Sequence, residues 1–205
     1  NYLNTVNKTW VLSRLAIEVE DMPKAYDKFF VETWVDSALR SFTSRNFKIV
    51  GESGHVYGYG KSVWAMIDLD TRHPADILAV RGGLITEYIE TEYPCPIEKS
   101  SRVKLSVGAT PIRSIDTYYN DVDINGHINS VKYIEHVLDL WDVAWYKQHC
   151  IKRFEIAYVA ESHQGDRLHF YREGRDSDTD FDVRITKSNR DSAEVEVCRC
   201  RVQFV

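Results

Sequence analysis

Three things are scarce in this 205-residue chain, and each scarcity excludes a class of protein. Its unbroken apolar runs are far shorter than the ~20 residues that a membrane-spanning helix needs, so we expect no membrane span. Basic residues are not in excess: 26 Lys and Arg against 31 Asp and Glu give a net charge of -5, which argues against nucleic acid as the main partner. Its four cysteines show no C-x-x-C spacing and are typical of free structural thiols in a reducing compartment.

The rest of the composition favours a β-rich protein with a substantial core. Hydrophobic residues make up 43% of the chain and aromatic residues 12%, and aromatic and β-branched side chains are typical of sheets. The length fits one ordinary domain or two of about 100 residues each. Residues 72–110 carry three of the five prolines and predict a linker with at most one or two short helices. We therefore place a domain boundary near residue 100, between units 1–99 and 100–205.

Runs with strand character dominate both halves. The first half has four, at residues 9–19, 28–35, 41–50 and 56–67. The second half has a short one and then, after a helix, four more, at residues 112–118, 154–160, 167–173, 180–186 and 193–204. Short polar turns separate these runs, and they predict an antiparallel meander in each half.

One long helix is predicted, over residues 129–146. Its apolar side chains recur about every 3.5 residues and form one stripe, made of Val131, Ile134, Val137, Leu138, Trp141, Ala144 and Trp145. An antiparallel sheet wrapped around a single helix, the hot-dog arrangement, buries such a stripe. We therefore predict an α+β protein with two hot-dog units in tandem. The first unit shows only the meander, so we expect the strand and helix that open it to precede residue 1.

The densest polar cluster lies just before this helix, at residues 121–129, with the sequence DVDINGHIN. Three interpretations compete. The spacing matches the start of an EF-hand calcium loop, but its twelfth position is Lys132 instead of a bidentate Glu. The Asp and Asn residues also suit turns and helix N-caps, which is a purely structural role. The third interpretation is a site that activates a carbonyl group.

A carbonyl site needs donors for an oxyanion and a base, and this cluster offers both. The amides and partial positive charge of a helix start stabilise an oxyanion. Asn125 is suited to hold a carbonyl oxygen or a water, and His127 to act as base or donor near neutral pH. Asp123 is expected to orient these neighbours. Glu161 follows an apolar strand and is either a solvated strand end or an inward carboxylate suited to a general base.

Two other patterns are weaker. Residues 58–62, GYGKS, end like a phosphate-binding P-loop, but His55 stands where the first glycine is needed and a strand follows. We interpret these glycines as a bulge or a close approach of two backbones. Four other histidines lack partners at metal-ligand spacing and are interpreted as surface or packing residues: His136, His149, His163 and His169.

Several segments together resemble one known family, the acyl-acyl-carrier-protein (acyl-ACP) thioesterases. Residues 121–139, DVDINGHINSVKYIEHVLD, resemble its D-x-N-x-H-x-N-N-x-K-Y-I signature. The strand end at 156–162, IAYVAES, resembles its Tyr-Arg-Arg-Glu-Cys segment. Three further segments are similar to its N-terminal half: TWVLSRLAIEVEDMP (9–23), VETWVDS (31–37) and SVWAMIDLDTRHP (62–74).

The resemblance implies tandem hot-dog domains that hydrolyse the thioester between a fatty acyl chain and acyl carrier protein in fatty acid biosynthesis, without a cofactor or a metal. By position, Asp123, Asn125, His127 and Glu161 correspond to the family's catalytic polar residues. Ser162 departs from the Cys that many members have after the Glu. A serine supplies no low-pKa thiolate, so we expect direct attack by water, with Glu161 as general base and His127 assisting.

The resemblance also implies an acyl slot in the first unit, for which Trp34, Trp64 and Met66 are candidate walls; alternatively they are ordinary core residues. Acyl carrier protein is acidic, so its docking needs a local basic patch. Two sets of residues are candidates for it: Arg40, Arg45, Lys48 and Lys61, or Arg113 and Lys132. A homodimer is compatible with this picture. The expected location is the cytoplasm for a bacterial-type protein and the plastid stroma for a plant protein.

Two other functions are compatible with the same fold. A hot-dog thioesterase that acts on acyl-coenzyme A shares the chemistry and differs in the carrier. A non-catalytic acyl-binding protein shares the slot but has no need of Asp123, Asn125, His127 and Glu161 together, so these residues argue against it.

Overall fold

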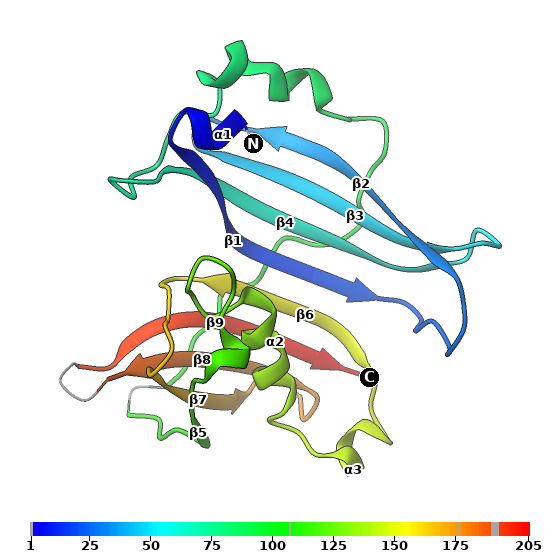
Figure 1. Ribbon diagram of the computed structural model, residues 1–205. Helices are drawn as coiled ribbons and strands as arrows, with labels where there is room; N and C mark the ends of the chain where they lie inside the picture. Colours follow the sequence, from blue (N-terminus) through cyan, green and yellow to red (C-terminus); the bar gives the residue numbers. More distant parts are fainter. Residues whose placement is uncertain (1, 107, 176, 190–192) are drawn as a thin grey trace. The chain divides into compact units, whose positions relative to one another are not determined.

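The computed structural model describes residues 2–106, 108–175, 177–189 and 193–205. The chain divides into two compact units, Asn1–Lys99 and Ser100–Val205. Each unit is built on an antiparallel sheet with few helices (Figure 1).

The first unit contains four long strands. Its elements are α1 (Tyr2–Thr5), β1 (Lys8–Val19), β2 (Phe29–Ala38), β3 (Phe42–Gly51), β4 (Val56–Asp68) and the 3₁₀ segment η1 (Val80–Tyr88). Strands β2, β3 and β4 form a meander. Strand β1, which precedes them in the chain, pairs with β4, so that the order in the sheet is β2-β3-β4-β1. The four strands match the predicted runs closely, and η1 confirms the short helix predicted in the linker.

The glycines of β4 mark a close approach of two backbones, as the sequence indicated. A Cβ atom on Gly58 would lie only 2.4 Å from the carbonyl oxygen of Glu18 on β1. The register between β3 and β4 also shifts next to this residue, between Ile49 and Val50. Glycine is required there, so GYGKS belongs to a strand and not to a phosphate-binding loop.

One face of the first sheet is covered by the segment that follows β4. Met66 is 1% exposed and packs against Ala75 and Ile77 of this segment. Partly buried side chains surround the cluster, and they are Leu3, Trp10, Val80 and Ile85. This hydrophobic cluster therefore holds η1 against the sheet.

The second unit begins with a strand and a helix and then continues as a sheet. Its elements are β5 (Arg113–Asp116), η2 (Tyr119–Asp121), α2 (Ser130–Leu138), α3 (Val143–Tyr146), β6 (Ile151–Tyr158), β7 (Arg167–Gly174), β8 (Asp180–Ser188) and β9 (Val195–Phe204). The order in the sheet is β6-β9-β8-β7-β5. The predicted meander is correct for β7, β8 and β9 but wrong for β6, which pairs with β9. The segment after β6 is bound to the turn before α2, and this leads the chain away from a hairpin.

The two units share one strand connectivity. Strand β1 pairs with the last strand of its meander, and β6 does the same. Among residues 2–106, nothing corresponds to β5 or α2. The four strands of the first unit thus repeat the pattern of β6 to β9, as the sequence indicated.

The predicted extent of the helix, residues 129–146, is wrong, because the chain breaks into α2 and α3. Arg172 Nη1 donates to the carbonyl of Leu140 at 2.7 Å, and the side chain of Asp142 caps α3 by accepting from the amide of Trp145. These contacts satisfy groups that a continuous helix would have used, so the chain can turn. No helix in the described ranges is long and apolar enough to cross a bilayer.

Helix α2 buries one stripe against the second sheet. Tyr133 and Val137 are 3% and 0% exposed, and the ring of Tyr133 contacts that of Tyr158 on β6 with centroids 6.1 Å apart. Trp141 continues this stripe, whereas Val131 is 52% exposed and lies outside it. One helix packed on an antiparallel sheet is the hot-dog arrangement, which is confirmed for this unit.

All four cysteines are free thiols. Cys198 and Cys200 on β9 are completely buried, and burial raises the pKa of both thiols, so they stay protonated. These two are structural residues, as the sequence predicted.

Charged side chains of the second sheet hold the incoming linker. Arg153 and Glu155 on β6 are 5% and 3% exposed and form an ion pair at 2.7 Å. The other carboxylate oxygen of Glu155 accepts from the amide and hydroxyl of Ser101, at 2.7 and 3.1 Å. The amide of Lys104 donates to Asp182 on β8 in the same way, at 3.0 Å. The main-chain amides of this linker are therefore bound by buried carboxylates of the sheet, and not by the main chain of a neighbouring strand.

Glu155→Ala is expected to lower the free energy of unfolding by about 3–5 kcal/mol, because it breaks a buried ion pair with Arg153 and removes the acceptor of two hydrogen bonds from Ser101. Denaturant unfolding measures this change. The control is Arg167→Ala, which breaks the exposed pair with Asp116 and should cost less than about 1 kcal/mol. Equal losses in the two variants would contradict a structural role for the buried pair.

Candidate active site

One carboxylate shapes the turn between η2 and α2. Asp123 accepts from the amides of Asn125 and His127, at 2.8 and 3.2 Å, and from the side-chain amide of Asn125 at 3.3 Å. Its own amide donates to the carbonyl of His127 at 2.8 Å. Gly126 has a φ of +84°, the left-handed conformation that favours glycine. Asp123 therefore orients both Asn125 and His127.

The imidazole of His127 meets the carboxylate of Glu161. The Nε2 atom of His127 lies 3.4 Å from Oε2 of Glu161. The two side chains are 28% and 39% exposed, so solvent and a ligand reach both of them. Glu161 is thus neither remote from the polar cluster nor fully buried. A carboxylate beside an imidazole in an accessible position is able to move a proton to or from a bound molecule.

A main-chain hydrogen bond joins the two segments that carry these side chains, from the amide of Ile128 to the carbonyl of Ser162 at 2.8 Å. Within the turn before α2, the amide of Asn129 donates to the carbonyl of Asp121 at 2.7 Å. Ile128 and Ser162 are 5% and 0% exposed, so the bond between them is shielded from water.

The start of α2 is already well capped. The side chain of Asn129 accepts from the amide of Val131 at 3.0 Å, and its carbonyl accepts from the amide of Lys132 at 2.9 Å. The hydroxyl of Tyr158 donates to the carbonyl of Ser130 at 3.0 Å. Two amides expected to face an oxyanion are therefore occupied, which leaves the side chain of Asn125 as the better-placed donor.

The hydroxyl of Ser162 is out of reach of a substrate, because this residue is 0% exposed. The nearby Tyr133 is also buried, and burial raises the pKa of its hydroxyl, so Tyr133 stays protonated. The only accessible group of the strand end that can take part in proton transfer is then the carboxylate of Glu161.

Asp121, the first residue of the calcium-like pattern, is used inside the protein. Its carboxylate accepts from the amide of Tyr118 at 2.8 Å and lies 3.1 Å from Nε2 of His136. Lys132, at the twelfth position, forms an ion pair with Glu135 at 2.7 Å. An ammonium group at the position of the bidentate ligand is incompatible with an EF-hand.

The sequence missed two contacts of this site. The ring of His163 lies edge-on to that of His127, with centroids 5.1 Å apart, and interpreting His163 as a surface or packing residue overlooked this. The ammonium of Lys187 on β8 contacts the carbonyl of Glu161 at 2.6 Å. The position of His163, two residues after Glu161, was a usable signal. No signal in the sequence pointed to Lys187, because it reaches the site from a strand that is distant in sequence.

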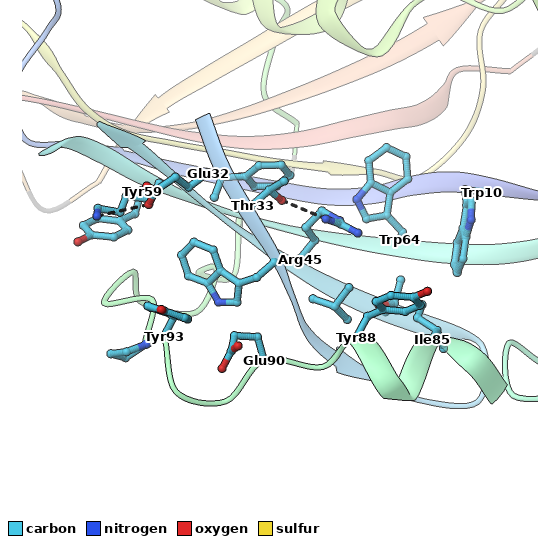
Figure 2. A pocket seen from close by; sticks show the side chains of 16 residues that line it. Trp10, Glu32, Thr33, Arg45, Tyr59, Trp64, Ile85, Tyr88, Glu90 and Tyr93 are labelled. Carbon is cyan, nitrogen blue, oxygen red and sulfur yellow. Dashed lines mark hydrogen bonds and ion pairs between the residues drawn. The ribbon is translucent and has the colours of Figure 1, made fainter. Parts of the chain in front are cut away.

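The first unit contains a cavity of about 1320 Å³ at the edge strand β2 (Figure 2). Its aromatic lining residues are Trp10, Trp34, Phe47, Tyr59, Trp64, Tyr88 and Tyr93. Segment 88–94 borders the cavity and is tied to β2, since the amide of Glu90 donates to the carbonyl of Val35 at 2.9 Å.

Two of the three predicted wall residues line this cavity, from opposite faces of the sheet. Trp34 lies opposite Asn46, which lies opposite Lys61 on β4. Lys61 and Trp64 are an odd number of positions apart on β4, so their side chains point to opposite faces. Met66 does not line the cavity, because it belongs to the buried cluster under η1. Of the two interpretations given for Met66, an ordinary core residue is the one that its burial supports.

The proposed basic patches are largely neutralised by neighbouring acids. Five of the six residues have a carboxylate within 4 Å, in the pairs Arg40–Asp76, Lys48–Glu32, Lys61–Asp36, Arg113–Asp139 and Lys132–Glu135. The sixth, Arg45, donates to the hydroxyl of Thr33 at 3.2 Å. Neither set is therefore a patch of uncompensated positive charge.

The chain is similar to acyl-ACP thioesterases along most of its length. A family model described as the acyl-ACP thioesterase N-terminal domain matches residues 1–80, and one described as the C-terminal domain matches residues 106–204. A chloroplastic palmitoyl-acyl carrier protein thioesterase from Gossypium hirsutum is 26% identical over 187 residues, which cover 89% of this chain and 45% of the relative. The chain thus spans less than half the length of this curated relative.

Solved structures agree with the family models. An acyl-ACP thioesterase from Bacteroides thetaiotaomicron is 48% identical, with a TM-score of 0.89, over 99% of this chain and 79% of that one. The 12:0-ACP thioesterase from Umbellularia californica is 21% identical, with a TM-score of 0.83, over 100% and 78% of the two chains, and at this identity it shows the fold alone. With both halves matched by its models, this tandem hot-dog chain belongs to the acyl-acyl-carrier-protein thioesterase family.

Proposed function

We propose that this protein hydrolyses the thioester of fatty acyl-ACP and releases free fatty acid in fatty acid biosynthesis. The observation that carries this proposal is the meeting of His127 and Glu161, 3.4 Å apart and both accessible, beside the turn that Asp123 organises. Membership of the family supports the same reaction. An acyl tail alone needs no such group of proton-transferring side chains, so the arrangement favours catalysis over simple binding.

In the proposed reaction a water molecule attacks the thioester carbon. Glu161, assisted by His127, takes a proton from this water as its oxygen bonds to the carbon. The carbonyl oxygen becomes negatively charged and accepts a hydrogen bond from the side-chain amide of Asn125. This amide has two N–H groups; one donates to Asp123, and the other is able to donate to the oxyanion. The carbon–sulfur bond then breaks, and the carrier thiolate takes up the proton held by the Glu161–His127 pair. The products are the fatty acid and the free carrier thiol.

We infer that the acyl chain occupies the cavity of the first unit. Seven aromatic side chains line it, Trp34 and Trp64 among them, and such surface is suited to a hydrocarbon chain. The Glu32–Lys48 pair, at 3.4 Å, neutralises two charges that also line the cavity. Two further polar lining residues, Thr33 and Arg45, are hydrogen-bonded to each other.

We infer that the carrier is acyl carrier protein and that the protein acts in a bacterial-type cytoplasm. The structure from Bacteroides thetaiotaomicron is 48% identical to this chain, whereas the curated plant relatives, which are chloroplastic, are near 30% or below. Acyl-coenzyme A is the alternative carrier, since it presents the same thioester to the same side chains.

The carrier is decided by comparing matched thioesters. We expect a higher kcat/KM on acyl-ACP than on acyl-coenzyme A at every chain length, with one preferred range of lengths, as measured by release of free fatty acid. Equal or faster turnover of the coenzyme A thioesters would favour the alternative carrier. Binding of acyl chains without any hydrolysis would favour a non-catalytic protein.

Glu161→Gln is expected to lower kcat about 10²- to 10⁴-fold, because the amide cannot accept the proton of the attacking water. Steady-state release of fatty acid from acyl-ACP measures this loss. The matched control is Glu135→Gln on the exposed side of α2, which should keep normal turnover. Near-normal activity of Glu161→Gln would refute its assignment as general base.

Ser162→Ala is expected to change kcat by less than about twofold, because this residue is 0% exposed and its hydroxyl is therefore out of reach of a substrate. The same assay measures it, with thermal unfolding as a check on folding. A severe loss of turnover in a normally folded variant would instead indicate a nucleophile at this position.

A further inference from the structure

The main chain of Glu161 lies beyond the hydrogen-bonded part of its strand. Strand β6 ends at Tyr158, and the amides of Val159 and Ala160 both donate to the carbonyl of Val197, at 2.8 and 3.4 Å. The regular hydrogen bonding between β6 and β9 therefore ends before Glu161. The position of Glu161 therefore depends on contacts made by other parts of the unit.

Lys187 makes one of these contacts, at the carbonyl of Glu161 itself. It lies near the end of β8, opposite Leu168 on β7. Its ammonium donates to the carbonyl of Glu161 at 2.6 Å and to Oδ2 of Asp166 at 3.3 Å. The side chains of Lys187 and Asp166 are only 22% and 12% exposed, so water screens these interactions weakly. Hydrogen bonds from a charged donor are about twice as strong as those between neutral groups.

Asp166 in turn holds the turn that follows Glu161. Its carboxylate accepts from the amide of His163 at 3.0 Å. Its carbonyl accepts from the amide and the hydroxyl of Thr117, at 3.1 and 2.8 Å. Thr117 is 2% exposed, and its hydroxyl also contacts the carbonyl of His163 at 2.9 Å. The turn is thus braced by Thr117 on one side and by Lys187 on the other.

We propose that Lys187 is a positioning residue for Glu161, an inference that rests on the proposed hydrolysis. Its ammonium binds the main chain of Glu161 and not the reacting atoms, so it acts through the placement of that carboxylate. The 3.4 Å separation between Glu161 and His127 depends on how the strand end is held, to which the bond from Ile128 to Ser162 contributes together with Lys187. A displacement of about 1 Å in such a group can cost about 10²-fold in rate.

The test compares variants of Lys187 with a matched lysine. Lys187→Met keeps the length of the side chain and removes the charge and the donors. We expect kcat on acyl-ACP to fall about 10- to 100-fold while KM stays within about twofold, because acyl binding in the first unit is untouched. Lys187→Arg, which retains a charged donor, should restore most of kcat. Lys147→Met, an exposed lysine on the chain after α3, should behave as the wild type.

A double-variant cycle shows whether the effect passes through Glu161. In a Glu161→Gln background, Lys187→Met should lower the residual single-turnover rate by less than about twofold, because no base is left to misplace. If Lys187→Met does not fold, as judged by thermal unfolding, Lys187→Gln takes its place; its amide still donates to the carbonyl but carries no charge, and a smaller loss of kcat is expected.

The outcomes separate this inference from the proposed function. Normal turnover of Glu161→Gln overturns the assignment of the base, and with it the role of Lys187. Loss in Glu161→Gln together with normal kcat in the Lys187 variants overturns the positioning role alone. An equal loss from Lys187→Met in both backgrounds also overturns it, since Lys187 would then act independently of Glu161.

Discussion

The site depends on one buried hydrogen bond, from the amide of Ile128 to the carbonyl of Ser162. His127 precedes the helix of the second unit and Glu161 follows a strand of its sheet, so neither element alone brings them together. The bond joins their neighbours at 2.8 Å, and both partners are almost fully buried, so water does not compete for it. The 3.4 Å meeting of imidazole and carboxylate is a consequence of this connection.

Most polar side chains around the site shape the backbone and do not face a substrate. Asp121 and Asp123 accept main-chain amides in the turn before α2, and Asn129 caps the helix. Asp166 does the same in the turn after Glu161. Under the proposed hydrolysis, these contacts would leave His127, Asn125 and Glu161 with little rearrangement to make, which is the condition for efficient electrostatic catalysis. The two units also differ in what they offer: the first has the aromatic cavity and the second has the polar turn.

The sequence predicted the strands, the start of the helix and the polar turn well, because each of these is encoded locally. Period-two runs such as residues 9–19 determine which face a strand buries, and an Asn before an apolar stripe determines a helix cap. Predictions from the sequence were wrong where contacts with residues distant in sequence determine the structure. Helix α2 stops early because Arg172, from β7, binds the carbonyl of Leu140. The pairing of β6 with β9 likewise follows from a loop that is held elsewhere.

By itself the sequence showed a resemblance to the family, predicted two units, and indicated four polar side chains for a carbonyl-activating site: Asp123, Asn125, His127 and Glu161. These follow from residue types at fixed spacing within two short segments, 121–129 and 156–162. Only the tertiary structure decided that His127 faces Glu161, that Ser162 is buried, and that Lys187 contacts the carbonyl of Glu161. The physical reason is that these contacts join segments distant in sequence, and their distances are set by how strands and helix pack, which local pattern does not encode.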